Sequence, residues 1–169
     1  INHIQNTPDA TNEEKQEAIN RVSAELARVQ AQINAEHTTQ GVKTIKDDAI
    51  TSLSRINAQV VEKESARNAI EQKATQQTQF INNNDNATDE EKETAKQFIN
   101  DEAQKALSQI NSATTNADVD TAKNSGLNTI NQYIPDFSKK KNATLKLYDV
   151  VDAQEAIINA FPDATEDEK

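Results

Sequence analysis

Ala10-Thr11-Asn12-Glu13-Glu14-Lys15 recurs as Ala87-Thr88-Asp89-Glu90-Glu91-Lys92 and again as Ala164-Thr165-Glu166-Asp167-Glu168-Lys169. The two intervals are equal, so residues 10–86 align with residues 87–163 without a gap, and 19 of the aligned positions are identical. Two diverged copies that keep the same length have kept a structural unit. The sequence therefore predicts a tandem array, and the function of the chain must depend on a row of such units.

The recurring segment has the pattern of a helix start. A Thr followed three residues later by a Glu forms a capping box, here Thr11 with Glu14, Thr88 with Glu91, and Thr165 with Glu168. The acidic residues also suit the positive end of the helix dipole. The first helix of each copy is therefore expected over about residues 12–36 and 89–113. Its first copy has one apolar stripe, made of Ile19, Val22, Leu26, Val29 and Ile33.

Two further helices are expected in each copy. The second follows the polar turns at 37–41 and 114–118, with Thr39 and Asn116 as the expected N-caps. The third contains residues 66–81 in one copy and 143–158 in the other. With only two Gly, three Pro and no Cys in 169 residues, the composition favours long helices over a sheet.

Short connections between consecutive helices predict antiparallel neighbours, so each copy is expected to be an up-down-up three-helix bundle. An odd number of helices brings the chain out at the end opposite its entry, and joined copies then extend along a line. The predicted fold is all-α, with tandem three-helix bundles joined end to end into an elongated rod. Residues 1–9 are expected to end a preceding third helix and form a junction, residues 10–86 and 87–163 to be the two repeats, and residues 164–169 to start the next repeat.

The charge and composition argue against several classes of function. The net charge of −10 repels phosphate backbones, so no nucleic-acid partner is expected. No apolar run reaches the length of about 20 residues that spans a membrane, so no membrane insertion is expected. No nucleophile elbow, phosphate-binding glycine loop or paired-carboxylate pocket is recognisable. The sequence therefore predicts that the chain is not an enzyme and has no cofactor.

Three groups of residues are candidates for binding sites. His3 and His37 have no partner at metal-ligand spacing, so both are expected on the surface. Asp118-Val119-Asp120 lacks the other ligands of a calcium loop and is expected to start a helix. Lys139-Lys140-Lys141 could attract an anionic partner, but the aligned Glu62-Lys63-Glu64 favours a solvated face. No metal site is predicted, and the sequence leaves the binding residues unknown.

The repeated phrase, the junction Thr7-Pro8-Asp9-Ala10-Thr11, and stretches such as 31–35 and 41–46 resemble a known repeat. They are similar to helical repeats, of similar length, in giant staphylococcal cell-wall-anchored surface proteins. This uncharacterised domain family includes the extracellular matrix-binding protein homologue and related accumulation-associated and methicillin-resistance surface proteins. The resemblance implies an extracellular location on the bacterial surface, with anchoring to the cell wall through regions outside this fragment. It carries over no catalytic or binding residues.

Two functions are compatible with this resemblance. The first is a structural stalk that projects an adhesin, with neighbouring repeats of the same chain as its partners and a monomeric state. The second is a weak multivalent binding module for a host extracellular matrix protein such as fibronectin, or for intercellular adhesion and biofilm. The exposed positions differ between the copies, as where Arg21 aligns with Phe98 and Lys43 with Asp120. A ligand site used by every repeat would look more alike, which favours the stalk.

Overall fold

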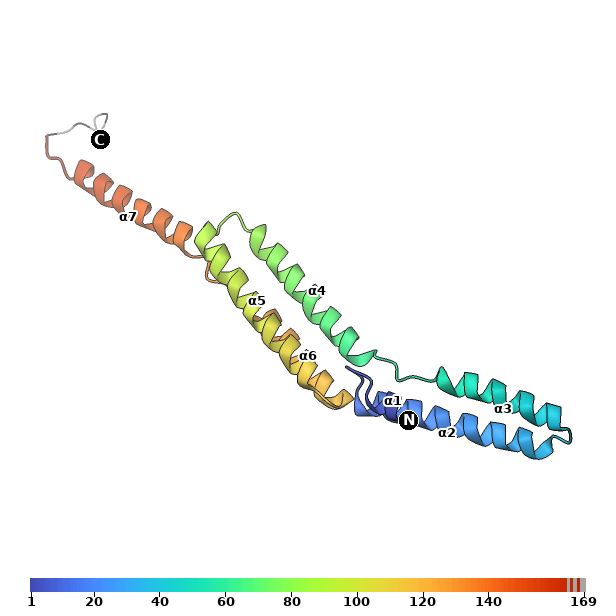
Figure 1. The fold of residues 1–169 in the computed structure, drawn as a ribbon. Helices are drawn as coiled ribbons and strands as arrows, with labels where there is room; N and C mark the ends of the chain where they lie inside the picture. The colour runs from blue at the N-terminus through green and yellow to red at the C-terminus, as the bar shows by residue number, and fades with distance from the viewer. Residues whose placement is uncertain (164, 166, 168–169) are drawn as a thin grey trace.

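The computed structural model describes residues 1–163, 165 and 167. Over these residues the chain is all-helical, with seven α-helices and no strand (Figure 1). The helices are α1 (Asn2–Gln5), α2 (Asn12–Ala35), α3 (Thr39–Ser54), α4 (Glu62–Asn82), α5 (Asp89–Ser112), α6 (Asn116–Gln132) and α7 (Lys139–Asn159). The predicted all-α class and the predicted extent of the first helix of each copy are thus confirmed.

Helices α4, α5 and α6 form a three-helix bundle in which each helix packs against the other two. Its core is built from small and branched apolar side chains, as expected for a unit of this size. Ile70, Ile99, Ile110 and Ile130 are almost completely buried at its centre. The rings of Phe98 and Tyr133 stack at its edge with centroids 4.0 Å apart. This bundle is the best-packed part of the chain.

Helices α2 and α3 form an antiparallel pair with a thinner core. The short helix α1 lies against the start of α2, where Ile4 is buried with Ala10, Ala18 and Ala58. Ile4 aligns with Ile81, the last buried residue of α4. Helix α1 therefore has the sequence and position of the end of a preceding third helix.

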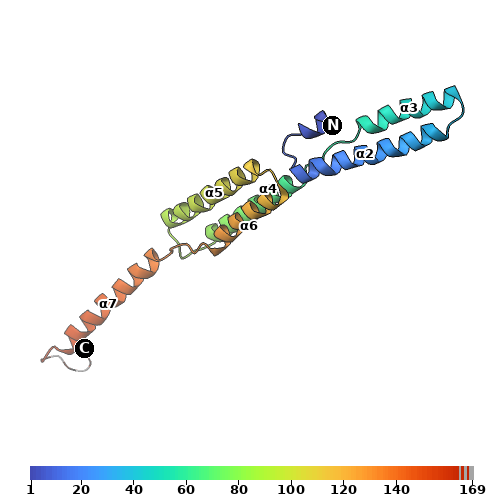
Figure 2. The same cartoon turned by 90° about the horizontal axis from the view of Figure 1, so that it is seen from below.

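The molecule is elongated, as Figures 1 and 2 show from two directions. The α2–α3 pair lies at one end, the α4–α5–α6 bundle in the middle, and α7 extends from the far end. Successive units thus follow one another along a line, because the chain passes through three helices before it leaves the bundle. This confirms the predicted end-to-end rod.

The structure groups the helices differently from the sequence prediction. We expected the last helix of each copy to pack on the two before it, so that 10–86 and 87–163 would each be a bundle. Instead, α4 packs on the two helices that follow it, α5 and α6. Every residue of α7 is exposed, and α7 makes no comparable packing contact with another helix in the described residues. The bundle therefore begins with the helix that the sequence prediction placed last.

The connections between helices explain this difference. Residues 83–88 form a turn that folds α5 back along α4. Residues 133–138 have no regular secondary structure and contain Pro135, and they carry the chain onward, away from α5 and α6, before α7 begins (Figure 1). Residues 56–61 do the same between α3 and α4. The third helix consequently packs against the following helices and extends beyond the preceding pair.

The helix starts are set by side-chain caps. Both capping boxes at Thr11 and Thr88 are present as predicted. The third predicted box includes Glu168, which lies outside the described residues. The predicted N-caps Thr39 and Asn116 are wrong by one residue. Thr38 and Thr115 cap α3 and α6, because each hydroxyl reaches the N–H three residues further on.

Candidate functional site

The first joint of the rod is the place where the N-terminal turns of α2, α4 and α6 meet, formed by residues 11–14, 61–62 and 114–116. Glu14 lies at its centre. One carboxylate oxygen of Glu14 accepts hydrogen bonds from the backbone N–H groups of Val61, at 2.7 Å, and Glu62, at 3.0 Å. The other oxygen accepts from the N–H of Thr11 at 2.8 Å. A single carboxylate therefore closes the capping box of α2 and caps α4.

The neighbouring residues connect α2 to the start of α6. The N–H of Asn12 donates to the carbonyl of Thr114 at 2.9 Å. The hydroxyl of Thr11 donates to Oδ1 of Asn116 at 2.6 Å, and the N–H of Asn116 donates to the carboxylate of Glu13 at 3.1 Å. Three positive helix ends thus meet near two carboxylates, an arrangement that offsets the mutual repulsion of the helix dipoles.

The hydrogen bonds at the first joint also affect the acidity of Glu14. Burial raises the pKa of Glu14, but the N–H groups of Thr11, Val61 and Glu62 together outweigh burial and hold the pKa below its ordinary value of 4.5. Hydrogen bonds to the charged form are the general cause of such a shift. Glu14 is therefore ionised in the folded chain at neutral and mildly acidic pH.

The second joint is formed by residues 88–91 at the start of α5 and Lys139 at the start of α7. Glu91 accepts from the N–H of Thr88 and from the N–H of Lys139, both at 2.9 Å. Those two N–H bonds are the main reasons that the pKa of Glu91 is lowered. Glu91 and Lys139 align with Glu14 and Glu62 of the preceding repeat, so the two joints repeat the same contact.

The helices capped in this way have no side-chain cap of their own. The N-cap residues of α4 and α7 are Val61 and Ser138, and neither makes a side-chain capping hydrogen bond. The first N–H groups of a helix need an acceptor. Glu14 of α2 provides it for α4, and Glu91 of α5 provides it for α7. The direction of each third helix is therefore tied to the first helix of its own repeat.

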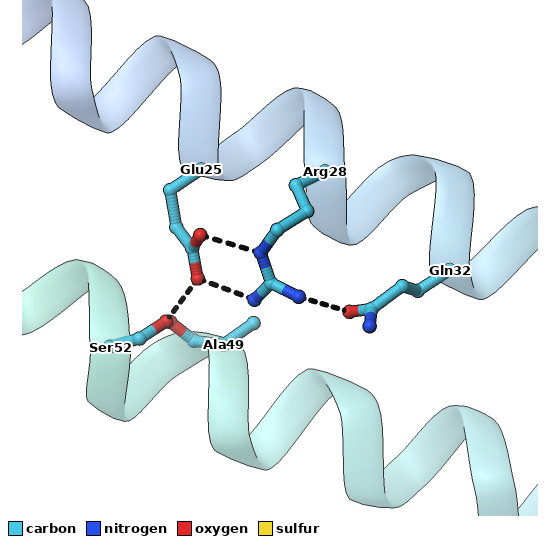
Figure 3. Close-up of polar contacts among 5 residues, drawn as sticks. All are labelled: Glu25, Arg28, Gln32, Ala49 and Ser52. Atoms are coloured by element: carbon cyan, nitrogen blue, oxygen red, sulfur yellow. Dashed lines mark hydrogen bonds and ion pairs between the residues drawn. The ribbon is translucent and has the colours of Figure 1, made fainter.

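Within the first unit, α2 and α3 are connected by a polar cluster around Glu25 (Figure 3). Arg28 donates from Nε and Nη2 to the two oxygens of Glu25, each at 2.7 Å, and Ser52 of α3 donates to the same carboxylate at 2.7 Å. The bonds from Arg28 and then Ser52 lower the pKa of Glu25 to about 2. This cluster connects two helices whose apolar core is thin.

The candidate residues from the sequence are not brought together. His3 and His37 are exposed and lie on α1 and between α2 and α3. Asp118 bonds Thr115 at the start of α6, and Asp120 pairs with Lys123 one turn later. Across residues 1–163, 165 and 167, no group of three His, Asp or Glu side chains is arranged to hold a metal ion. In the same part of the chain, no helix is both long and apolar enough to cross a bilayer.

The basic run at 139–141 lies at the second joint. The backbone of Lys139 bonds Glu91, and Nζ of Lys140 donates to the carbonyl of Asp85 at 2.7 Å. The sequence pattern predicts only a capping-box role for Glu14 and Glu91, whereas in the structure each also caps a second helix. The signal was present, because Glu14 and Lys63 are identical to Glu91 and Lys140 in copies that otherwise share about a quarter of their residues.

A family model described as Domain of Unknown Function (DUF1542) matches residues 1–61 and 62–138. The chain belongs to the DUF1542 family. The second match begins at the first residue of α4 and ends just before α7, so one DUF1542 repeat coincides with the α4–α5–α6 bundle and the segment that follows it.

Similar proteins are found among the extracellular matrix-binding proteins of Staphylococcus aureus. The chain is 31% identical over its whole length to "Extracellular matrix-binding protein EbhA" of Staphylococcus aureus (strain Newman) and covers 5% of that protein. It is also 31% identical to "Extracellular matrix-binding protein ebh" of Staphylococcus aureus (strain NCTC 8325 / PS 47) and covers 2% of it. No solved structure matches the chain. These DUF1542 repeats therefore correspond to a small part of much longer matrix-binding proteins.

Proposed function

We propose that this chain is a non-catalytic structural segment of a long helical stalk, which projects a bacterial surface adhesin from the cell wall. The observation that carries the proposal is the repeated joint. At both joints a capping-box carboxylate also caps the third helix of its repeat, Glu14 for α4 and Glu91 for α7. Both repeats keep this carboxylate contact although most of their aligned residues differ. This supports a role for the contact in holding successive parts of the rod in line.

The dimensions of the helices support the idea that the stalk serves to span distance. Helix α5 has 24 residues, which at a rise of 1.5 Å per residue corresponds to roughly 36 Å. Each added bundle lengthens the rod by about the same distance, since consecutive units lie end to end. The connecting segments carry buried or half-buried apolar residues, such as Ala58 and Phe137, that pack against the cores. Such segments act as fixed corners, unlike solvated flexible linkers.

The cell-wall location is part of the same proposal. It rests on the names of the relatives, which describe extracellular matrix-binding proteins, and on the small share of those proteins that the chain covers. Anchoring would then depend on other regions of a longer polypeptide.

A second candidate is that the repeat itself binds a matrix protein weakly, with fibronectin as the first ligand to test and intercellular adhesion as a related role. The printed name of the relatives favours it. Many weak sites in series could give useful avidity. Against it stands the divergence of exposed positions between the two copies.

Small-angle X-ray scattering combined with a matrix-binding assay separates the two candidates. The stalk predicts an elongated pair-distance distribution that stays the same from low to physiological salt, and no saturable binding to immobilised fibronectin or other matrix proteins. A compact distribution would refute the stalk. Saturable binding that survives physiological salt would favour the binding module.

A further inference from the structure

The order of the helices decides which parts of the chain carry load when the rod is pulled along its length. The chain enters the first joint at residue 11, passes out along α2 and back along α3, and returns to the same joint at residue 61. The two ends of this helical hairpin lie together, although 47 positions separate Glu14 from Val61. Bonds between the two ends would let tension bypass the hairpin.

The first joint contains such bonds. One carboxylate oxygen of Glu14 accepts from the backbone N–H groups of Val61 and Glu62. The guanidinium of Arg67, in the second turn of α4, pairs with the carboxylate of Asp9 at 3.0 Å. Tension that enters the joint at residues 9–14 thus has a route into α4 that does not use α2 or α3.

The direction of the Glu14 bonds suits them to carry load. The free N–H groups at the start of a helix point along its axis, beyond its N-terminal end. Helices α2 and α4 begin at the joint and extend to opposite sides of it, so the first N–H groups of α4 point toward α2 along the rod (Figure 1). A pull along the rod therefore stretches the bonds from Val61 and Glu62 together. Bonds that are loaded together share the force, whereas bonds loaded in turn break one at a time.

A second connection ties the same segment to α6. The hydroxyl of Thr11 donates to Oδ1 of Asn116, which lies 105 positions further along the chain. The N–H of Asn12 donates to the carbonyl of Thr114 at 2.9 Å. Helix α6 runs from this joint to the far end of the bundle, as α4 does. Tension therefore enters the bundle through the starts of α4 and α6 at once, and the core between them is not peeled apart from one end.

The second joint repeats the arrangement. Glu91, in the first turn of α5, accepts from the N–H of Lys139 at 2.9 Å, and Nζ of Lys140 donates to the carbonyl of Asp85 at 2.7 Å. These bonds connect the segment that follows α4 to the start of α7, across the 48 positions that contain α5 and α6. The same relation between a carboxylate, a third helix and an intervening hairpin thus occurs twice in the chain.

We propose that the two joints are tension clamps. When the chain is pulled from both ends, load passes through the joint bonds from residues 9–14 to α4 and from residues 85–91 to α7. The hairpins α2–α3 and α5–α6 stay folded outside the path of the force until a clamp opens. The first hairpin is then a reserve of length, because the 47 peptide units between Glu14 and Val61 extend to roughly 160 Å. This inference deepens the proposed stalk and rests on it for its purpose, since a stalk that projects an adhesin is pulled along its axis.

Constant-force optical tweezers test the clamps on the whole chain, with handles joined to its two ends. Once the short helix α1 has detached, the wild-type chain should lengthen in one step of roughly 160 Å of contour as the first clamp opens. This step should come before the bundle unfolds, because the α2–α3 pair has the thinner core. Glu14→Gln should shorten the time before the step about fivefold at the same force. Gradual lengthening of the wild-type chain without a step would overturn the proposal.

Thr38→Ala is the matched control. It removes the N-cap of α3 at the far end of the same hairpin, and N-cap losses have similar effects on the free energy of unfolding. Urea unfolding should therefore show comparable destabilisation of both variants, whereas only Glu14→Gln should shorten the time before the step under force. An equal shortening in Thr38→Ala would mean that force reports general stability, and it would overturn the proposal.

A different point of attachment gives the decisive comparison. The sequence contains no Cys, so His37→Cys, in the exposed turn between α2 and α3, provides a unique handle. A pull between residue 37 and the C-terminal end runs along α3 directly into α4 and leaves Glu14 unloaded. Glu14→Gln should then change the time before the first lengthening by less than about twofold. An equal effect in both pulling directions would refute the clamps, while an elongated scattering profile would still leave the proposed stalk intact.

Discussion

At Gly126 the helices α5 and α6 come closer than a side chain would allow. A Cβ at this position would lie 2.5 Å from Cβ of Ala106 and 2.9 Å from Cδ1 of Ile70. Gly126 aligns with Ala49 of α3, and the structure gives the reason for the difference. Ala49 belongs to the pair that has no full third helix, whereas Gly126 faces a helix on each side.

Gly126→Ala should therefore destabilise the bundle. Overpacking costs about 1–3 kcal/mol, and the better helix propensity of Ala returns about 1 kcal/mol, so a net loss of about 1 kcal/mol is expected. Urea unfolding followed by circular dichroism measures this change in the free energy of unfolding. Ala49→Gly is the comparison, and it should lower stability by about 1–2 kcal/mol, because it loses helix propensity and also removes a buried methyl group. A stabilising Gly126→Ala substitution would show that the helices separate at little cost.

At the same scale, the two units use different chemistry at one position. Phe98 stacks on Tyr133 in the bundle, whereas the aligned Arg21 donates to the carbonyl of Asn57 at 2.8 Å, beside Ile56. The stacked rings hold α5 to the segment after α6, and the Arg21 hydrogen bond holds α2 to the segment after α3. Residues that looked unrelated in the alignment therefore serve the same structural purpose.

At the scale of the element, the start of α4 depends on a residue 48 positions earlier in the chain. Val61 offers no polar side chain at the N-cap, so without Glu14 the first N–H groups of α4 would bond only to water. The same dependence holds for α7 and Glu91. The hydrogen bonds at the two joints thus set the direction of α4 and α7 and the residue at which each helix begins.

Glu14→Gln should loosen the start of α4. The amide has one acceptor oxygen in place of two and no charge, so it cannot cap both helices as well. The expected loss of stability is on the order of 1 kcal/mol, as for other N-caps. Amide hydrogen exchange of Val61 and Glu62, measured by NMR, should speed up. Glu17→Gln, one turn further along α2 and exposed, should leave these two amides unchanged.

At the scale of the whole molecule, the alignment of the units should depend on pH. The pKa values of Glu14 and Glu91 are lowered in the folded chain, and that of Glu25 is lowered to about 2, from an ordinary value of 4.5. A lowered pKa means that the folded state holds the proton less tightly than the unfolded state does. These groups therefore stabilise the fold above pH 4.5, and their contribution is lost as pH falls through the lowered values.

The unfolding temperature should be nearly constant between about pH 7 and pH 5 and should fall below about pH 4.5. The joints should loosen first, because Glu25 keeps its charge until about pH 2. Circular dichroism melts and X-ray scattering at each pH measure both effects. The double variant Glu14→Gln with Glu91→Gln should show a smaller pH dependence than the wild-type chain. An unfolding temperature that rises on acidification would mean that relief of the net charge of −10 dominates.

The sequence by itself determined the all-α class, the repeat of residues 10–86 as residues 87–163, and the start of each first helix. These features are local, because a capping box and an apolar stripe act over a few turns of one helix. Thr11 and Thr88 are caps in the structure as their spacing predicted. The elongated shape was also predictable, since it depends on the odd number of helices and not on which three of them pack together.

Only the tertiary structure decided how the helices are grouped. The two copies align at the same interval whichever residue is chosen as the start of the repeat. The alignment therefore cannot show whether the third helix packs with the two helices before it or with the two helices after it. The path of residues 56–61 and 133–138 decides this, because these irregular segments lead the third helix onward, whereas the turn at residues 83–88 sends α5 back along α4. The joints depend on that choice, since Glu14 reaches Val61 and Glu62 only after the chain has taken this path.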